Sequence, residues 1–154
     1  MKTATVCCFL LVSTALMLAK EGAKPCGRKD AILAEQEASS LRSWTEVYKS
    51  YRRFRQCDDG AIGEGYSDSI VRLLSEKWSS TDQLDRLASH DRGFRSFVLH
   101  HIDELMSPSQ AETIRNNAET RCPSRAGKFC KEIAVRLKEV SAGAMDSAPG
   151  SQKH

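Results

Sequence analysis

The apolar residues of this chain recur at spacings of three and four, and this period limits the fold more than any other feature. One stretch carries Leu41, Trp44, Tyr48 and Tyr51 at such spacings, so all four share one face of a helix. No convincing run alternates apolar and polar residues as a half-buried strand does. The pattern therefore predicts an all-α fold, an irregular bundle of five to six short helices with disulfides.

Similar stripes divide the rest of the chain into expected helices. The segments are 41–56, 66–78, 80–88, 91–105, 107–122 and 127–140. Capping boxes are expected at Ser80 and at Ser107, where Pro108 also favours a helix start. Upstream, residues 31–38 are good helix formers. If Ser39 and Ser40 interrupt the helix, this segment stands alone; otherwise it joins the next.

The N-terminal residues resemble a secretory signal peptide. Lys2 supplies a positive charge, residues 6–18 are mostly apolar, and Ala19 is a small residue suited to cleavage, with Ala23 as the second choice. The run is too short to cross a hydrocarbon core of ~30 Å, which disfavours a membrane anchor. We expect a signal peptide over 1–19, a helical domain over 20–140, and a disordered tail over 141–154.

Cleavage after Ala19 would remove Cys7 and Cys8 and leave an even number of cysteines, which favours two disulfides in an exported chain. Those that remain are Cys26, Cys57, Cys122 and Cys130. An unbroken helix over 30–56 would hold its ends ~40 Å apart, whereas bonded cysteines need Cα atoms within ~7 Å. Either the chain bends near Ser39 and Ser40, or one pair does not form.

Cys122 ends one expected helix and Cys130 lies in the first turn of the next. Such a corner suits a local bridge, so we expect Cys122 to pair with Cys130 and, by elimination, Cys26 with Cys57. The rival pairing joins Cys57 to Cys122 or Cys130 and would link the first helix to the last two.

The most unusual stretch combines carboxylates with glycines. Asp58, Asp59, Glu64 and Asp68 surround three glycines, which predict a loop over 57–65. Carboxylates beside flexible backbone bind hard cations or transfer protons. The alternative is local: the first two carboxylates end a helix in a turn, and Asp68 favours the start of the next. The spacing does not match an EF-hand.

Two further clusters of polar residues could form binding sites, but each also has a simpler structural explanation. His100, Asp103 and Glu104 would share one side of a helix and present zinc ligands, but no His-Glu-x-x-His motif supports this. We expect no metal, and we expect His101 to be a hydrogen-bonded core histidine. Arg52 and Arg53 belong to a basic helix face that would suit a sulfated glycan or an anionic lipid surface. The simpler alternative is a solvated face, with cations favoured in the last turn of a helix.

Composition narrows the class of function without identifying it. The formal net charge of +3 is too small to indicate nucleic-acid binding, and no nucleophile, P-loop or dinucleotide motif is present. We therefore expect a secreted, non-catalytic binding protein without a cofactor, whose partner is a protein or a small molecule. The alternative is a small hydrolase that uses Asp58, Asp59 or Glu64 with His101.

Overall fold

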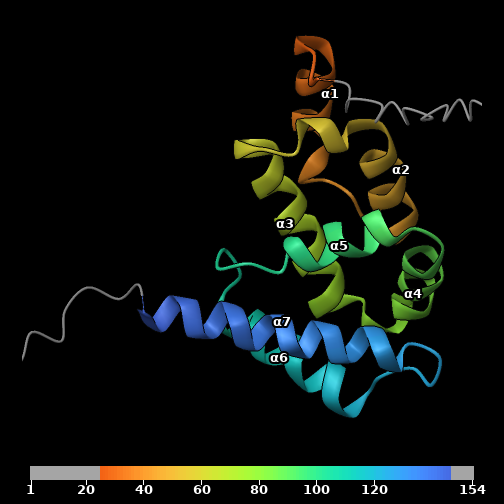
Figure 1. Ribbon diagram of the computed structural model, residues 1–154, viewed down its shortest axis with the longest axis vertical. Coiled ribbons are helices and arrows are strands. Elements are labelled where there is room, and N and C mark those ends of the chain that lie inside the picture. The colour runs from red at the N-terminus through yellow and green to blue at the C-terminus, as the bar shows by residue number, and fades with distance from the viewer. Residues whose placement is uncertain (1–24, 147–154) are drawn as a thin grey trace, which may run out of the picture.

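The computed structural model describes residues 25–146, and within this range it is all-α, with seven α-helices and two short 3₁₀ helices (Figure 1). The helices are α1 (Arg28–Ala38), α2 (Trp44–Phe54), α3 (Gly60–Glu76), α4 (Thr81–His90), α5 (Arg92–His100), α6 (Pro108–Thr120) and α7 (Gly127–Asp146). The 3₁₀ helices are η1 (Arg55–Cys57) and η2 (Trp78–Ser80). The expected signal peptide lies outside the described residues.

The helix count exceeds the expected five to six because the chain breaks at Ser39 and Ser40. Side chains of α3 satisfy the carbonyls that α1 leaves open there: Ser69 Oγ donates to Ala38 O at 2.6 Å, and Arg72 Nη2 donates to Ser39 O at 3.1 Å. Ser43 then caps α2 by accepting from Glu46 N at 3.3 Å. The sequence locates the break, and the contacts with α3 stabilise it.

Both disulfides have the pairing that the sequence favours. Cys26 bonds to Cys57 with a Cα–Cα distance of 4.9 Å, and Cys122 bonds to Cys130 with 6.1 Å. The bend after α1 turns the chain back, so the start of α1 lies beside η1 and the distance conflict of a continuous helix does not arise.

The expected loop over 57–65 is wrong, because α3 begins at Gly60 and includes the other two glycines. Gly60 has φ +51°, which an L-residue adopts at a cost. Gly65 allows α1 to approach, since a Cβ there would lie 2.9 Å from Ala38 Cβ. Gly60 therefore permits the start of α3, and Gly65 permits the close contact between α1 and α3.

Two other expected boundaries also change. The segment 91–105 ends as a helix at His100, and Leu105, placed on the core stripe by its spacing, is 61% exposed. At the other end, α7 continues past Val140 to Asp146, where Ser141 Oγ donates to Leu137 O in helical register at 2.8 Å. The rest of the expected tail lies outside the described residues.

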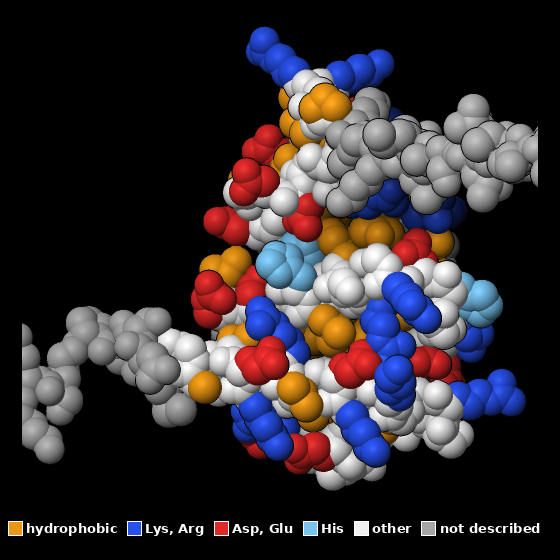
Figure 2. Space-filling view, in the orientation of Figure 1, with side chains coloured by type: hydrophobic (Ala, Val, Ile, Leu, Met, Phe, Trp, Pro, Cys, Tyr) orange, Lys and Arg blue, Asp and Glu red, His pale blue; other side chains and the backbone are white. Residues whose placement is uncertain are grey.

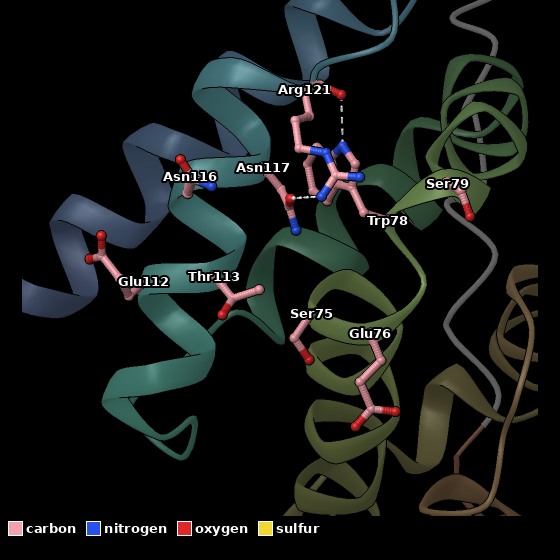
Figure 3. Close-up of a pocket in the computed structure, with 9 residues that line it drawn as sticks. All are labelled: Ser75, Glu76, Trp78, Ser79, Glu112, Thr113, Asn116, Asn117 and Arg121. Carbon is pink, nitrogen blue, oxygen red and sulfur yellow. Dashed lines mark hydrogen bonds between the residues drawn. The ribbon is translucent and has the colours of Figure 1, made fainter.

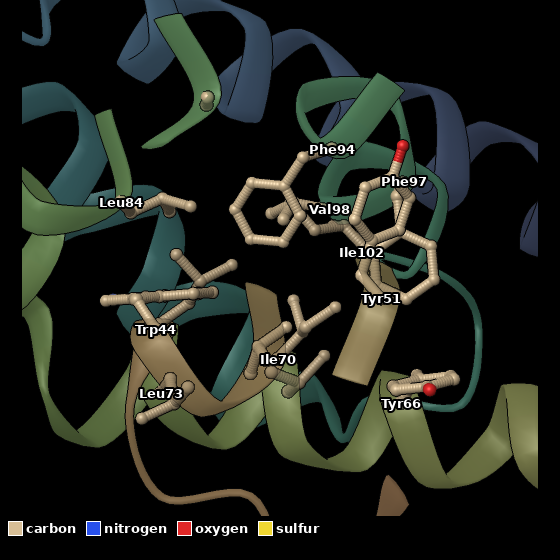
Figure 4. Packing of buried hydrophobic residues seen from close by; sticks show 14 of the residues in the cluster. Trp44, Tyr51, Tyr66, Ile70, Leu73, Leu84, Phe94, Phe97, Val98 and Ile102 are labelled. Atoms are coloured by element: carbon tan, nitrogen blue, oxygen red, sulfur yellow. The ribbon is translucent and has the colours of Figure 1, made fainter. Parts of the chain in front are cut away.

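The core gathers around α3, a helix of 17 residues that runs through the middle of the molecule in Figure 1. Figure 4 shows aromatic rings of α2, α3 and α5 meeting there: Trp44 and Tyr66 are fully buried, and Tyr66 packs edge-on against Phe97 with ring centroids 5.0 Å apart. The α6 and α7 helices pack against each other at the opposite end from α1. Among the described residues, no helix is long and apolar enough to span a bilayer.

Candidate functional site

The carboxylates singled out by the sequence do not form one site. Asp59 caps α3 by accepting from Gly60 N at 2.8 Å. Asp68 forms an ion pair with Arg72 one turn along α3, at 3.1 Å. Glu64 and Asp68 both line a hollow of about 60 Å³, which holds no more than a few water molecules. Asp58 points elsewhere, toward His101.

Asp58, His101, Ser67 and Asp103 form a chain of hydrogen bonds across three parts of the sequence. His101 Nε2 lies 3.2 Å from Asp58 Oδ2, and its Nδ1 lies 3.0 Å from Ser67 Oγ. The Ser67 hydroxyl donates to Asp103 Oδ2. These hydrogen bonds thereby connect the segment before α3, α3 itself and the turn after α5.

The hydrogen-bonded residues are of the types found in a hydrolytic triad, but they are not accessible to a substrate. Ser67 is 2% exposed and His101 is 3% exposed, so a substrate carbonyl could not reach the hydroxyl without local opening. The hydroxyl has one proton, which it gives to Asp103, so its oxygen can only accept from His101 Nδ1.

The suggested zinc ligands do not share a helix face, because α5 ends at His100 and the two acidic residues lie in the following turn. Within residues 25–146, no group of three His, Cys, Asp or Glu side chains is placed to hold a metal ion. The basic face of α2 is present and exposed. Arg52 lies 3.7 Å from Asp91, and Arg53 stacks on the Phe54 ring at 4.5 Å.

A more concentrated surface feature lies between α5 and α7, with a contribution from the end of α4. Two adjoining hollows of about 390 and 540 Å³ share Leu99, Lys128 and Glu132 as lining residues. We call the combined feature the α5–α7 groove. Its apolar part includes Leu99 and Val135, of which Val135 is 54% exposed although it occupies the middle of a helix.

Cations dominate the α5–α7 groove. Arg95 Nε binds Glu132 at 2.6 Å, and Arg136 Nη1 lies 3.5 Å from Glu139, so both acidic residues of the lining are already paired. Arg92, Lys128 and Lys131 form no ion pair with another described residue. Figure 2 shows Lys and Arg side chains over α7, interspersed with acidic side chains and small apolar patches.

One further detail belongs to the same groove. The Arg95 guanidinium stacks on the Phe129 ring at 4.8 Å, and its Nη2 is buried without a hydrogen-bond partner. Among the described residues, Arg95 Nη2 is the one buried side-chain nitrogen or oxygen that has no hydrogen-bond partner. A buried guanidinium N–H without an acceptor carries a desolvation cost.

Sequence reasoning did not predict the α5–α7 groove, although α7 carries a signal for it. Its core stripe of Phe129, Ile133 and Leu137 is buried. A second stripe holds Lys128, Lys131, Val135 and Glu139 at spacings of three and four, and an apolar residue between cations on this face is the informative exception. The contribution of α5 depends on the tertiary fold.

A function for this protein is inferred from its own residues and their geometry. No family model, no curated protein and no solved structure matches it.

Proposed function

We propose that this chain is an exported, non-catalytic binding protein whose α5–α7 groove docks an acidic segment of a partner protein. One observation carries the proposal: the half-exposed Val135 lies in a groove bordered by cations that lack acidic partners among the described residues. Apolar contact supplies the driving force for docking, and unpaired cations select acidic partners and speed their encounter.

The chemistry of the groove favours a protein over the other anionic partners. A sulfated glycan offers charge without apolar side chains to cover Leu99 and Val135. An anionic bilayer is flat, whereas this surface is concave. An amphipathic segment that carries both carboxylates and apolar side chains satisfies both parts of the groove.

The hydrolase alternative has less support. Asp59 caps α3, Asp58 belongs to the buried hydrogen-bonded chain, and Glu64 lines only the hollow of about 60 Å³. The histidine and serine of the buried chain are nearly inaccessible. Two disulfides suggest an oxidising compartment, and we extend this to secretion after cleavage at Ala19. N-terminal sequencing of exported protein should begin at residue 20; an intact Met1 would contradict export by cleavage.

A peptide-display selection on the protein beginning at residue 20 tests the docking proposal. We expect the selected peptides to combine Asp or Glu with apolar side chains, and NMR shift changes on binding to concentrate in α5 and α7. Lys131→Glu should weaken binding about tenfold, the loss of roughly one close charge pair. Val135→Asp should weaken it further.

Lys49→Glu is the matched control, because it changes the net charge equally on the basic face of α2. It should leave peptide binding within about twofold, because Lys49 does not line the groove. Selected peptides without acidic residues would contradict the proposal. Greater loss with Lys49→Glu than with Lys131→Glu would transfer the site to α2.

A further inference from the structure

A second, polar hollow of about 490 Å³ lies between the end of α3, η2 and α6, away from the α5–α7 groove (Figure 3). We call it the α3–α6 pocket. Its size is within the range of small-ligand sites, which is ≈ 300–1,000 Å³. Its lining has no residue in common with the groove or with the carboxylates of the 58–68 segment.

The wall of the α3–α6 pocket is fixed by hydrogen bonds between its own residues. Trp78 Nε1 donates to Arg121 O at 2.9 Å, which also satisfies a carbonyl at the end of α6. Arg121 Nη1 donates to Asn117 Oδ1 at 3.3 Å. Trp78 and Asn117 are 6% and 4% exposed, so both side chains are held in place before any ligand arrives.

Asn117 presents an unused donor to this pocket. Because Arg121 donates to its Oδ1, the amide nitrogen is the atom that faces the hollow, toward Ser75 and Thr113 in Figure 3. Within residues 25–146, this nitrogen has no hydrogen-bond partner. A nearly buried amide with an open N–H pair is oriented to donate to a ligand.

The facing hydroxyls present acceptors. Ser75 Oγ donates its proton to Val71 O at 2.9 Å, and Thr113 Oγ1 donates to Ser109 O at 2.8 Å, both within their own helices. Their lone pairs remain open. The α3–α6 pocket thus offers donors on one side and acceptors on the other, and a ligand hydroxyl group matches both because it donates and accepts.

The charged side chains around the α3–α6 pocket disfavour both anionic and cationic ligands. The side chains of Glu76 and Glu112 lie on opposite rims and point away from the hollow in Figure 3, and Glu112 is paired with Arg115 at 2.7 Å. The Arg121 guanidinium is the cation in the lining. The rim carboxylates disfavour an anion, while the Arg121 guanidinium disfavours a cation.

We propose that the α3–α6 pocket binds a neutral, hydroxyl-rich ligand of about one or two sugar units. The Asn117 amide donates to a ligand hydroxyl, and the oxygens of Ser75 and Thr113 accept from it. The indole of Trp78 supplies an apolar wall for the C–H face of a ring. This site is independent of the docking function proposed for the α5–α7 groove.

NMR titration with three sugars of the same ring tests the ligand class. Glucose is neutral, glucosamine is cationic and glucuronic acid is anionic, and cellobiose extends the neutral series to two units. We expect the neutral sugars to shift the Asn117 side-chain amide and Trp78 indole signals most, with the larger response to cellobiose. A stronger response to either charged sugar, or no response to any neutral sugar at millimolar concentrations, would overturn the proposal.

Asn117→Asp tests the donor, since it keeps an oxygen for Arg121 and removes the N–H pair. It should weaken binding of the neutral sugar about tenfold. Gln36→Glu adds the same charge on the exposed side of α1, which does not line this pocket, and should change affinity much less. Equal weakening by both variants would refute the assigned donor.

Two further variants protect the test against misfolding and against confusion with the groove. Thr113→Val is isosteric at an exposed position, so it should fold normally and should weaken sugar binding by removing an acceptor; unchanged affinity would count against the site. Lys131→Glu should leave sugar binding intact even where it abolishes peptide docking, because the two surfaces share no residue.

Discussion

Tyr66 is a buried phenol in the aromatic core, and its hydroxyl lies 2.7 Å from Ser50 Oγ. Burial raises the pKa of Tyr66 to about 12, although the hydrogen bond with Ser50 opposes part of this rise. Burial and, secondly, the charge of Asp91 also raise the pKa of Tyr51. The fold therefore resists ionisation of its central tyrosine.

The raised pKa of Tyr66 predicts a loss of stability at alkaline pH. Because the folded-state pKa exceeds the ordinary value of 10.0, the stabilisation is complete below pH ~10 and is lost as pH rises toward about 12. Tyr66→Phe should show a smaller loss of unfolding free energy across this interval than the wild type. Chemical denaturation and near-ultraviolet tyrosinate absorbance measure this; ionisation of Tyr66 near pH 10 in folded protein would contradict it.

Ser67 completes the buried polar chain, and its removal should be costly. Ser67→Ala leaves His101 Nδ1 and Asp103 without their shared partner, so we expect a loss of ~1–3 kcal/mol in unfolding free energy. Ser75→Ala is the control on the same helix, since that hydroxyl bonds only to carbonyls of α3. Denaturant unfolding should separate the two variants, and equal effects would remove the structural role assigned to the chain.

At the scale of elements, Gly65 sets how closely α1 packs on α3. A Cβ at this position would lie 2.9 Å from Ala38 Cβ and 3.1 Å from Ser39 N, so Gly65→Ala must push the two helices apart. We expect a destabilisation of ~1–3 kcal/mol from overpacking, measured by thermal or denaturant unfolding.

Gly143→Ala provides the opposite expectation for the same substitution. Gly143 lies in α7, and a Cβ there meets nothing within 4 Å, so the change should be neutral or should stabilise by up to ~1 kcal/mol through helix propensity. A stabilising Gly65→Ala would show that the glycine serves no close contact.

The sequence predicts a helix start well where a side chain caps its own helix. It predicts the start less well where a distant residue binds the capping side chain. Ser107 and Gln110 form the expected capping box, and Asp91 caps α5 by accepting from Phe94 N at 3.0 Å. Ser80 was expected to cap α4 and does not. Its hydroxyl instead donates to Lys77 O and accepts from the indole of Trp44, a partner that local sequence cannot identify.

At the scale of the molecule, the surface sites were the least predictable features because each combines residues far apart in sequence. The α3–α6 pocket requires α6 to pack beside the end of α3. Likewise, Asp58 and His101 meet across 43 positions. Apolar period predicts which residues face the core, but it leaves open which exposed faces of different helices adjoin.

Each disulfide joins cysteines that are consecutive in the described chain, with sequence separations of 31 and 8. In an unfolded chain, the entropic cost of bringing two thiols together grows with the length of the loop that they close. Both rival pairings would require two longer loops. Random encounters therefore favour the native pairs before any helix has packed.

Oxidation of the reduced protein in strong denaturant should accordingly give the pairs Cys26–Cys57 and Cys122–Cys130 as the most abundant isomer, as measured by non-reducing peptide mapping. A majority of peptides linking Cys57 to Cys122 or Cys130 would contradict this. The spacing of the cysteines thus favours the native pairs, and the reduced chain needs little thiol–disulfide exchange to reach its native covalent state.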